Sequence, residues 1–293
     1  MKKAAEKSIT IVHPGTHNLH LRVFAIDGEN PFDVLQNLNY YSLIWIKQGA
    51  GSARADFSDY PFSAGTLFAF TPYQPFIFFP EYQMTGVAIN FHPDFFCIHQ
   101  HHKEVACNGV LFNNIYEPPF ITVDESMAAV LDGLISRIKA EMQANDLAQH
   151  DSLVAYLKIF LITASRAKSQ QNNIAVAGHT HQPRVLQDLK ELIELHFQAK
   201  HTAANYAELL HVTPKSLGKM VKKQFNKTIT SLINERIVIE AKRQLYLTDR
   251  SVKEIAHSLG FEDEYYFSRF FKKQVDVSPQ IYRKAVGFAR ERS

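Results

Sequence analysis

SVKEIAHSLGFEDEYYFSRFFKKQVDVSPQIYRK, residues 251–284, is the stretch that decides the fold of the second half of this 293-residue chain. Its apolar residues recur at helical spacing on both sides of Gly260, and glycine readily adopts the positive φ of a tight turn. Ser278 followed by Pro279 is typical of a helix start, where an N-cap residue precedes a proline at the first helical position. The pattern predicts a short helix, a turn and a second helix, which is the helix-turn-helix arrangement.

A degenerate copy of this pattern lies about 50 residues earlier in the chain. Residues 206–210 (YAELL) correspond to 255–259 (IAHSL) at an offset of 49, and residues 217–224 (LGKMVKKQ) correspond to 267–274 (FSRFFKKQ) at an offset of 50. The region therefore contains two helix-turn-helix motifs in tandem. The segment between them, 228–247, predicts one long connecting helix.

The ends of the two copies agree as well. Asn226 and Asp276 follow the two KKQ helices at equivalent positions, and Asn and Asp are the non-glycine residues that best tolerate a left-handed C-cap. The turn differs, because the first copy has His211 where the second has Gly260.

In the second helix of each copy, apolar residues face one way and polar or basic residues face the other. A helix that enters the major groove needs side chains for base edges near its start and cations for phosphates. A solvated basic face is the ordinary explanation for one such helix, but two tandem copies favour DNA binding. The candidate DNA-binding residues are Lys215, Ser216, Lys219, Lys222 and Lys223 in the first copy, and Glu264, Tyr265, Ser268, Arg269, Lys272 and Lys273 in the second.

The charge distribution supports the same interpretation. The net charge is only +3, but residues 1–183 hold 12 Lys and Arg against 16 Asp and Glu, whereas residues 184–293 hold 20 against 13. A basic excess confined to one end of a chain indicates that this end meets a polyanion.

These motifs resemble the signature of the AraC/XylS family of bacterial transcription regulators. The LGF turn, the YFSRFFKK helix, the SP pair and the following IYR carry the resemblance, which covers residues 184–290 or so. It implies a DNA-binding domain of seven helices, whose recognition helices, here 214–225 and 264–275, enter adjacent major-groove segments on one face of the DNA. The family's base-contacting positions fall on Lys215, Gly218 and Lys219, and on Glu264, Tyr265, Ser268 and Arg269. Gly218 departs from the family pattern because it offers no side chain.

The N-terminal half predicts a different architecture. Six short runs rich in β-branched and aromatic residues, at 19–26, 41–49, 51–57, 65–72, 75–80 and 84–91, favour a small β-barrel or sandwich. Helical patterns follow at 124–143 and 151–167. The second is apolar nearly all round, so it packs on its own barrel or forms a dimer interface.

The segments 65–76 and 86–96 resemble, more weakly, the cupin-like sensor domain of the same family. The resulting fold class is α+β in two domains: a cupin-like β-barrel with two trailing helices, then an all-α double helix-turn-helix domain. We expect the sensor or dimerisation domain at 1–168 (barrel about 9–123, helices about 124–168), a linker at 169–183, and the DNA-binding domain at 184–293. The resemblance implies double-stranded promoter or operator DNA, RNA polymerase, a small-molecule effector and a second copy of the chain as partners.

The stretch FHPDFFCIHQHHKE, residues 91–104, raises a metal-site hypothesis because it contains His92, His99, His101, His102 and Glu104. Metal-binding cupins use an HxH pair followed by Glu on barrel strands. Here the position six residues before His99 is Pro93 instead of glycine, and the histidines follow the last predicted strand. We expect a polar surface loop or a short helix, and no metal or other cofactor. The alternative is a metal sensor or metal-dependent cupin enzyme fused to a DNA-binding domain.

The remaining features fit a regulator without catalytic activity. There is no glycine-rich phosphate loop, no GxSxG and no CxxC. Cys97 and Cys107 are too few for a disulfide framework, and neither an apolar run of membrane-spanning length nor a secretory signal is evident. We expect a cytoplasmic protein that does not bind membranes. A third hypothesis is a regulator that acts through a protein partner, if aromatic side chains fill the N-terminal interior.

Overall fold

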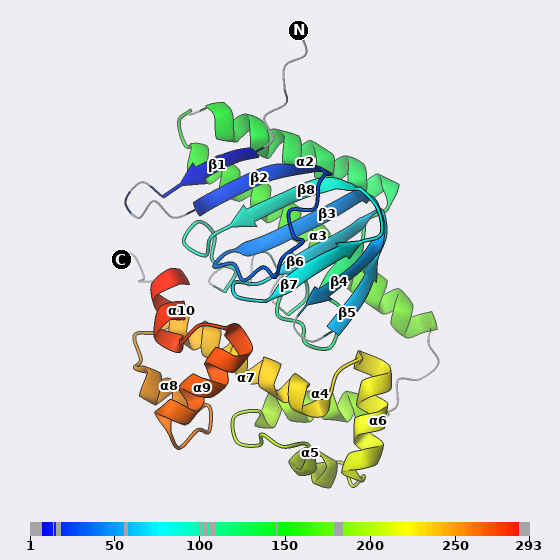
Figure 1. Cartoon of the computed structure of the whole chain (residues 1–293), viewed down its shortest axis with the longest axis vertical. Coiled ribbons are helices and arrows are strands. Elements are labelled where there is room, and N and C mark those ends of the chain that lie inside the picture. The colour runs from blue at the N-terminus through cyan, green and yellow to red at the C-terminus, as the bar shows by residue number, and fades with distance from the viewer. Residues whose placement is uncertain are drawn as a thin grey trace. The chain divides into compact units, whose positions relative to one another are not determined.

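The chain divides into two compact units in the computed structural model (Figure 1), which describes residues 8–13, 15, 19–55, 58–99, 101, 105, 109–144, 146–178 and 184–286. The sheet unit comprises Met1–Asn114 and Pro119–Gln171, and the helical unit comprises Ile115–Pro118 and Asn172–Ser293. The predicted α+β organisation in two domains is confirmed.

Two antiparallel sheets form the sheet unit. The larger has the order β1-β2-β8-β3-β6-β9, and the smaller has the order β5-β4-β7. The strands of the larger sheet are β1 (Ser8–Val12), β2 (Leu19–Gly28), β8 (Met84–Phe91), β3 (Tyr41–Gln48), β6 (Thr66–Phe70) and β9 (Phe120–Thr122). Those of the smaller sheet are β5 (Ser58–Phe62), β4 (Gly51–Ala55) and β7 (Phe76–Pro80). The six predicted strands are confirmed.

Strands β1, β5 and β9 were not anticipated from the sequence. Each lies at an edge of its sheet and has five residues or fewer. β5 also contains Pro61, which is compatible with an edge strand but weakens a strand prediction. These short edge strands are defined by their pairing partners more than by their own residues.

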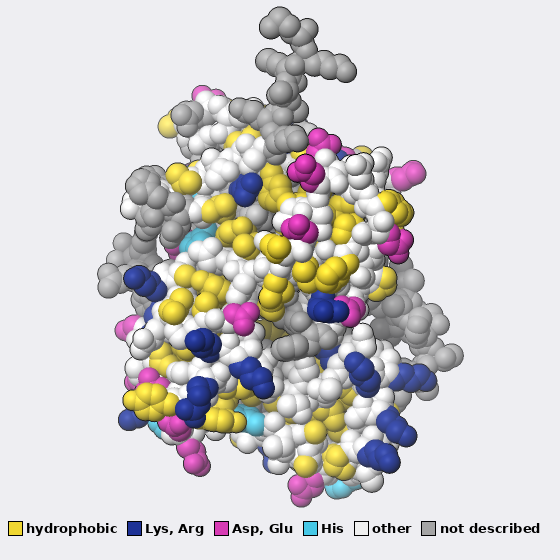
Figure 2. All heavy atoms as spheres, in the orientation of Figure 1, with side chains coloured by type: hydrophobic (Ala, Val, Ile, Leu, Met, Phe, Trp, Pro, Cys, Tyr) yellow, Lys and Arg dark blue, Asp and Glu magenta, His cyan; other side chains and the backbone are white. Residues whose placement is uncertain are grey.

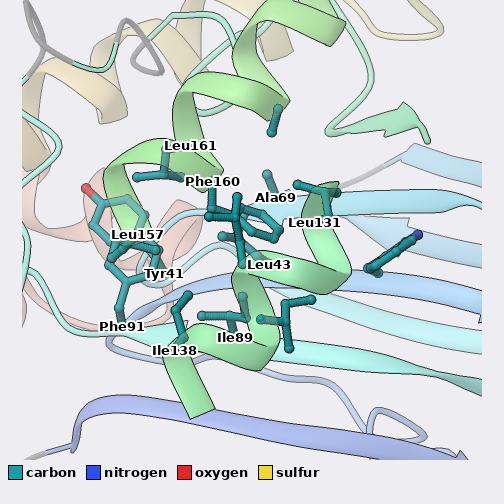
Figure 3. Packing of buried hydrophobic residues seen from close by; sticks show 14 of the residues in the cluster. Tyr41, Leu43, Ala69, Ile89, Phe91, Leu131, Ile138, Leu157, Phe160 and Leu161 are labelled. Carbon is teal, nitrogen blue, oxygen red and sulfur yellow. The ribbon is translucent and has the colours of Figure 1, made fainter. Parts of the chain in front are cut away.

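The larger sheet is buried on both faces, with alternate residues of each strand facing opposite ways. On one face Leu43 and Ile89 pack against helices α2 (Glu125–Ala144) and α3 (Gln149–Gly178), as Figure 3 shows. On the other face Ile44 and its neighbours pack toward the smaller sheet. Burial on both sides explains why residues 43–46 of β3 are all apolar instead of alternating with polar residues.

The predicted closed barrel is not confirmed. In the described residues the two sheets share no ladder of strand pairing, so their edges stay open and the arrangement is a two-layer sandwich. Phenylalanine rings fill the space between the layers: Phe70 stacks on Phe76 with centroids 4.1 Å apart, and Phe68 meets Phe78 edge-on at 5.0 Å. Large rings at these positions separate the layers by side-chain packing, which requires no continuous hydrogen-bonded wall.

Helix α3 continues well past the predicted end at 167. Residues 169–178 were expected to be linker, yet they extend the helix to Gly178. Tertiary hydrogen bonds hold this polar section: Lys168 Nζ donates to the Phe120 carbonyl at 2.6 Å, and the Thr122 amide donates to Gln171 Oε1 at 3.1 Å. Propensity alone does not indicate a helix here, but side chains that bond β9 stabilise it. Residues 179–183 of the predicted linker lie outside the described residues.

The helical unit contains the seven helices that the family resemblance implies. They are α4 (Arg184–His196), α5 (Ala203–Leu209), α6 (Pro214–Phe225), α7 (Ile229–Leu247), α8 (Val252–Ser258), α9 (Glu264–Val275) and α10 (Pro279–Val286). The long α7 contacts α4, α6, α8, α9 and α10, and buries Leu232, Ile237, Ala241 and Leu245. No helix in the described part of the chain combines the length and the hydropathy that crossing a bilayer requires.

The tandem repeat is visible as two helix-turn-helix motifs. Helices α5 and α8 are each followed by a residue with positive φ, His211 (54°) in the first motif and Gly260 (80°) in the second. A Cβ added to Gly260 would lie 2.0 Å from the Gln198 carbonyl oxygen, so glycine is required there both by conformation and by space. His211 occupies the same turn with a side chain.

We expect His211→Gly to raise the free energy of unfolding by about 0.5–1 kcal/mol, because glycine adopts the left-handed conformation without the strain of a Cβ. This value is a net gain, since the greater freedom of glycine in the unfolded chain offsets part of the relief. Gly260→Ala should lower the free energy of unfolding by more than this amount. Urea unfolding of both variants measures the difference. Loss of stability in His211→Gly would show that the histidine side chain stabilises the turn.

Candidate nucleic-acid interface

Helix α6 is the second helix of the first motif, predicted from the sequence to be its recognition helix, and its two faces differ in composition. Leu217, Val221 and Phe225 are buried on one face. The helix begins with a capping hydrogen bond in which Thr213 Oγ1 accepts from the Ser216 amide at 3.2 Å, and Pro214 follows the cap. The sequence-predicted contact residues of this motif all lie exposed on the other side: Lys215, Ser216, Lys219, Lys222 and Lys223.

The same helix ends as predicted, at a residue in the left-handed conformation. Asn226 has φ 55° and caps α6, and Lys222 Nζ donates to the Asn226 carbonyl at 2.9 Å. Cations in the last turn are also favoured by the helix dipole. Lys222 therefore stabilises the helix end while its ammonium group stays at the surface.

Helix α9 repeats this arrangement in the second motif, 50 residues later. Phe267, Phe271 and Val275 are buried, at the positions of Leu217, Val221 and Phe225. Six predicted contact residues lie on the outer side, where Glu264 and Ser268 are half-buried and the others are exposed: Glu264, Tyr265, Ser268, Arg269, Lys272 and Lys273.

The two ends of α9 also match those of α6. Asp263 caps the start, accepting from the Tyr265 amide at 3.0 Å and from the Tyr266 amide at 2.9 Å, and Asp276 ends the helix at φ 63°. The predicted left-handed C-caps are thus confirmed in both copies.

The recognition faces are available for a polyanion. Lys and Arg side chains are frequent on the helical unit in the face shown in Figure 2. Nine of the eleven predicted contact residues are classed as exposed, so their cations lose little by exchanging water for phosphate oxygens. Together the two helices present base-capable and phosphate-capable side chains on equivalent faces.

Lys227 is also a basic residue of this region, but it is buried and holds the fold together instead of lying at the surface. Its side chain is buried; Nζ donates to the Ile115 carbonyl at 3.1 Å and pairs with Glu235 Oε2 at 2.6 Å. Glu235 also accepts from Ser231 Oγ at 3.0 Å. Lys227 follows α6 directly, so this network holds the end of the recognition helix.

Tyr116 reinforces the same end of α6 and was missed from the sequence. Its ring lies 5.9 Å from that of Phe225, and its hydroxyl donates to Glu194 Oε1 at 3.2 Å. Burial, with the Glu194 carboxylate nearby, raises the pKa of this phenol far above its ordinary value. No local pattern signals the contact, because Tyr116 lies about 100 residues from α6 in the chain.

The histidine stretch has a structural explanation where it is described. His92 is buried, and its Nδ1 accepts from the Asp94 amide at 3.2 Å. His101 stacks on Phe96 with ring centroids 4.9 Å apart. Among the described residues, no group of three or more His, Cys, Asp or Glu side chains is placed to hold a metal ion. His102 and Glu104 lie outside the described residues.

A second group of histidines in the sheet unit was not anticipated. The ring of His20 meets that of His13 at 4.7 Å and lies 5.8 Å from Phe95, which in turn contacts His150. Burial, with the nearby His13 among its other causes, lowers the pKa of His20 to about 4, so the ring is neutral at pH 7. Cys97 is buried, and Cys107 lies outside the described residues.

Comparison with known proteins identifies the helical unit. A family model described as a helix-turn-helix domain matches residues 206–285. The transcriptional activator RhaS of Salmonella schwarzengrund is 27% identical over 172 residues, which cover 58% of this chain and 59% of that protein. The transcriptional activator Btr of Bacillus subtilis is 27% identical over 110 residues, 38% of this chain and 21% of that protein. The chain thus spans less than two thirds of the length of either relative.

Solved structures with similarity include the C-terminal domain of AraT, a response regulator from Geobacillus stearothermophilus. It is 28% identical and has a TM-score of 0.37, with 39% of this chain and 94% of that domain covered. ToxT from Vibrio cholerae is 16% identical with a TM-score of 0.41, covering 91% of this chain and 98% of that one.

Gly218 interrupts the exposed face of α6 without any structural need for glycine. A Cβ built there meets no atom within 4 Å, and its φ is not positive. We expect Gly218→Ala to raise the free energy of unfolding by about 0.5–1 kcal/mol, the helix-interior difference between Gly and Ala.

Gly133, an exposed glycine within α2 with equally open surroundings, is the matched control, and Gly133→Ala should stabilise the protein similarly. Urea unfolding gives both values. If Gly218→Ala lowers the free energy of unfolding while Gly133→Ala raises it, the space around Gly218 is not open.

Proposed function

We propose that this chain, which belongs through its helix-turn-helix domain to the AraC/XylS family, is a sequence-specific DNA-binding regulator of transcription. The observation that carries the proposal is the pair of 12-residue helices α6 and α9, each with its apolar stripe buried and its basic and polar residues outward. A single basic helix face is common on soluble proteins, but two equivalent faces on one rigid helical scaffold suit two segments of one duplex.

Roles within the two faces follow from side-chain chemistry. Lys222, Lys223, Lys272 and Lys273 lie toward the ends of their helices, and we assign them to phosphates. Lys219 and the equivalent Arg269 lie one turn nearer the start, where a recognition helix meets base edges. Both are donors that suit the N7 and O6 acceptors of guanine. Lys215, Ser216, Tyr265, Ser268 and Glu264 complete the proposed interface.

For the sheet unit we propose a regulatory role, in effector binding or dimerisation. The phenylalanine-filled space between the two sheets favours an effector site outside the sandwich, or control by a protein partner. One pocket of about 430 Å³ lies elsewhere, along α3. Its walls combine Val105, Val110 and Ile162 with the polar side chains of Ser165, Arg166, Ser169 and Gln170.

Helix α3 also supports the proposed homodimer. Ile159 keeps 48% of its surface exposed although Leu157, Phe160 and Leu161 are buried beside it. The apolar circumference of the helix is therefore only partly covered within one chain. We also propose that the protein contacts RNA polymerase, on the family resemblance alone. That it activates transcription is proposed from the names of the relatives.

The proposal is tested by fluorescence anisotropy of the full chain with duplex fragments from its own upstream region, at several salt concentrations and with unlabelled competitor. One fragment should bind tightly in the presence of competitor, with affinity that falls steeply as salt rises, because bound phosphates release counterions. Equal, weak binding of every fragment would contradict a sequence-specific regulator.

In the same assay we expect Arg269→Ala to weaken binding of the preferred fragment by about 1–3 kcal/mol and to relax specificity at one position. A uniform loss for all fragments would instead assign Arg269 to phosphate. Lys253→Ala is the control, since Lys253 is an exposed cation of α8 outside both recognition faces.

A further inference from the structure

The two motifs share a scaffold but differ in charge. Residues 203–226, which contain α5 and α6, hold four lysines and one glutamate. Residues 252–276, which contain α8 and α9, hold four Lys and Arg but five Asp and Glu. The net charges are therefore +3 and −1. Phosphate attraction favours the first motif strongly, whereas the second motif brings carboxylates toward a polyanion.

Three of those acids stand together at the start of α9: Glu262, Asp263 and Glu264. The first motif has Thr213 and Pro214 at the positions of the last two. Asp263 has a structural role as the N-cap of α9, because both of its carboxylate oxygens accept hydrogen bonds from backbone amides. Glu264 is different, since its carboxylate takes part in no hydrogen bond or ion pair within the described residues.

Glu264 stands in the first turn of α9, and it is half-buried on the side of the helix that carries Ser268. The start of a recognition helix is the part that reaches base edges. A carboxylate there has only acceptor oxygens, and in the major groove its matching donor is the N4 amino group of cytosine. Adenine also has an amino donor, N6, but places it beside the N7 acceptor, which repels a carboxylate, and guanine and thymine present acceptors, as the phosphates do.

We propose that Glu264 selects a cytosine in the DNA segment that α9 contacts, by accepting a hydrogen bond from the cytosine N4 amino group. The residue thereby gives the second motif a positive preference for one base pair and a penalty against the rest. The first motif has no counterpart, because Pro214 at the equivalent position offers neither donor nor acceptor in its side chain. This inference rests on the proposed function.

The test compares the full chain with Glu264→Gln and Glu264→Ala on the preferred upstream fragment, on single-base-pair variants of it and on random duplex of equal length. The wild type should lose about tenfold in affinity when one C·G pair of the α9 segment is changed. Glu264→Ala should lose that discrimination, and it should bind random duplex more tightly than the wild type, because a negative charge is gone. Glu264→Gln keeps one acceptor oxygen and gains an amide donor, so it should keep only part of the discrimination.

Glu262→Ala is the matched control, since Glu262 is an exposed acid two residues away that precedes the helix. It should gain affinity for random duplex and keep the discrimination at the C·G pair. Urea unfolding of each variant tests the alternative that the Glu264 carboxylate only stabilises the N-terminus of α9. In that case the Glu264 variants would unfold at lower urea and keep their base preference.

The outcomes are distinct. If the wild type distinguishes no fragment from random duplex, the proposed function fails, and this inference fails with it. If the wild type discriminates but Glu264→Ala keeps every base preference, the proposed function stands and the role of Glu264 is overturned. Loss of preference at one C·G pair in Glu264→Ala, but not in Glu262→Ala, establishes the role.

Discussion

Burial of the apolar stripes of α6 and α9 is the interaction on which the rest of the helical unit depends. Leu217, Val221 and Phe225 in one motif, and Phe267, Phe271 and Val275 in the other, face the interior that α7 organises. Truncating one such side chain costs about 2–5 kcal/mol, a large fraction of a domain's 5–15 kcal/mol. Because each stripe faces inward at a spacing of four residues, residues on the opposite side of the helix must face water. The basic recognition faces are a consequence of this packing as much as of their own chemistry.

Strongly periodic elements were predictable from the sequence, and elements that depend on distant partners were not. The two helix-turn-helix motifs, the long connecting helix and the left-handed C-caps at Asn226 and Asp276 follow from local spacing and residue type, whereas the total of seven helices follows from the family resemblance. The edge strands β1, β5 and β9 and the extension of α3 to Gly178 do not, because each is stabilised by pairing or by hydrogen bonds to another segment. The barrel predicted for the N-terminal half became an open sandwich for a similar reason: strand patterns specify which residues are buried but not whether sheet edges meet.

The candidate interface shows the same division. The outward orientation of its eleven predicted residues follows from helical periodicity, and in the structure nine of them are exposed while Glu264 and Ser268 are half-buried. The supporting contacts escaped prediction. Lys227 looks like another DNA-facing cation in the sequence, yet it is buried against Ile115 and Glu235. The histidines between 91 and 101 look like metal ligands, yet His92 and His101 are occupied by a local turn and by the Phe96 ring.

The central claim is that both motifs engage one DNA duplex, and hydroxyl-radical footprinting of the full chain on its preferred fragment tests it most directly. The account predicts two protected clusters on one face of the DNA, separated by about one helical turn of 10–10.5 base pairs. A single protected cluster, unchanged by substitutions in α9, would contradict it and would leave only the first motif as a DNA-binding element.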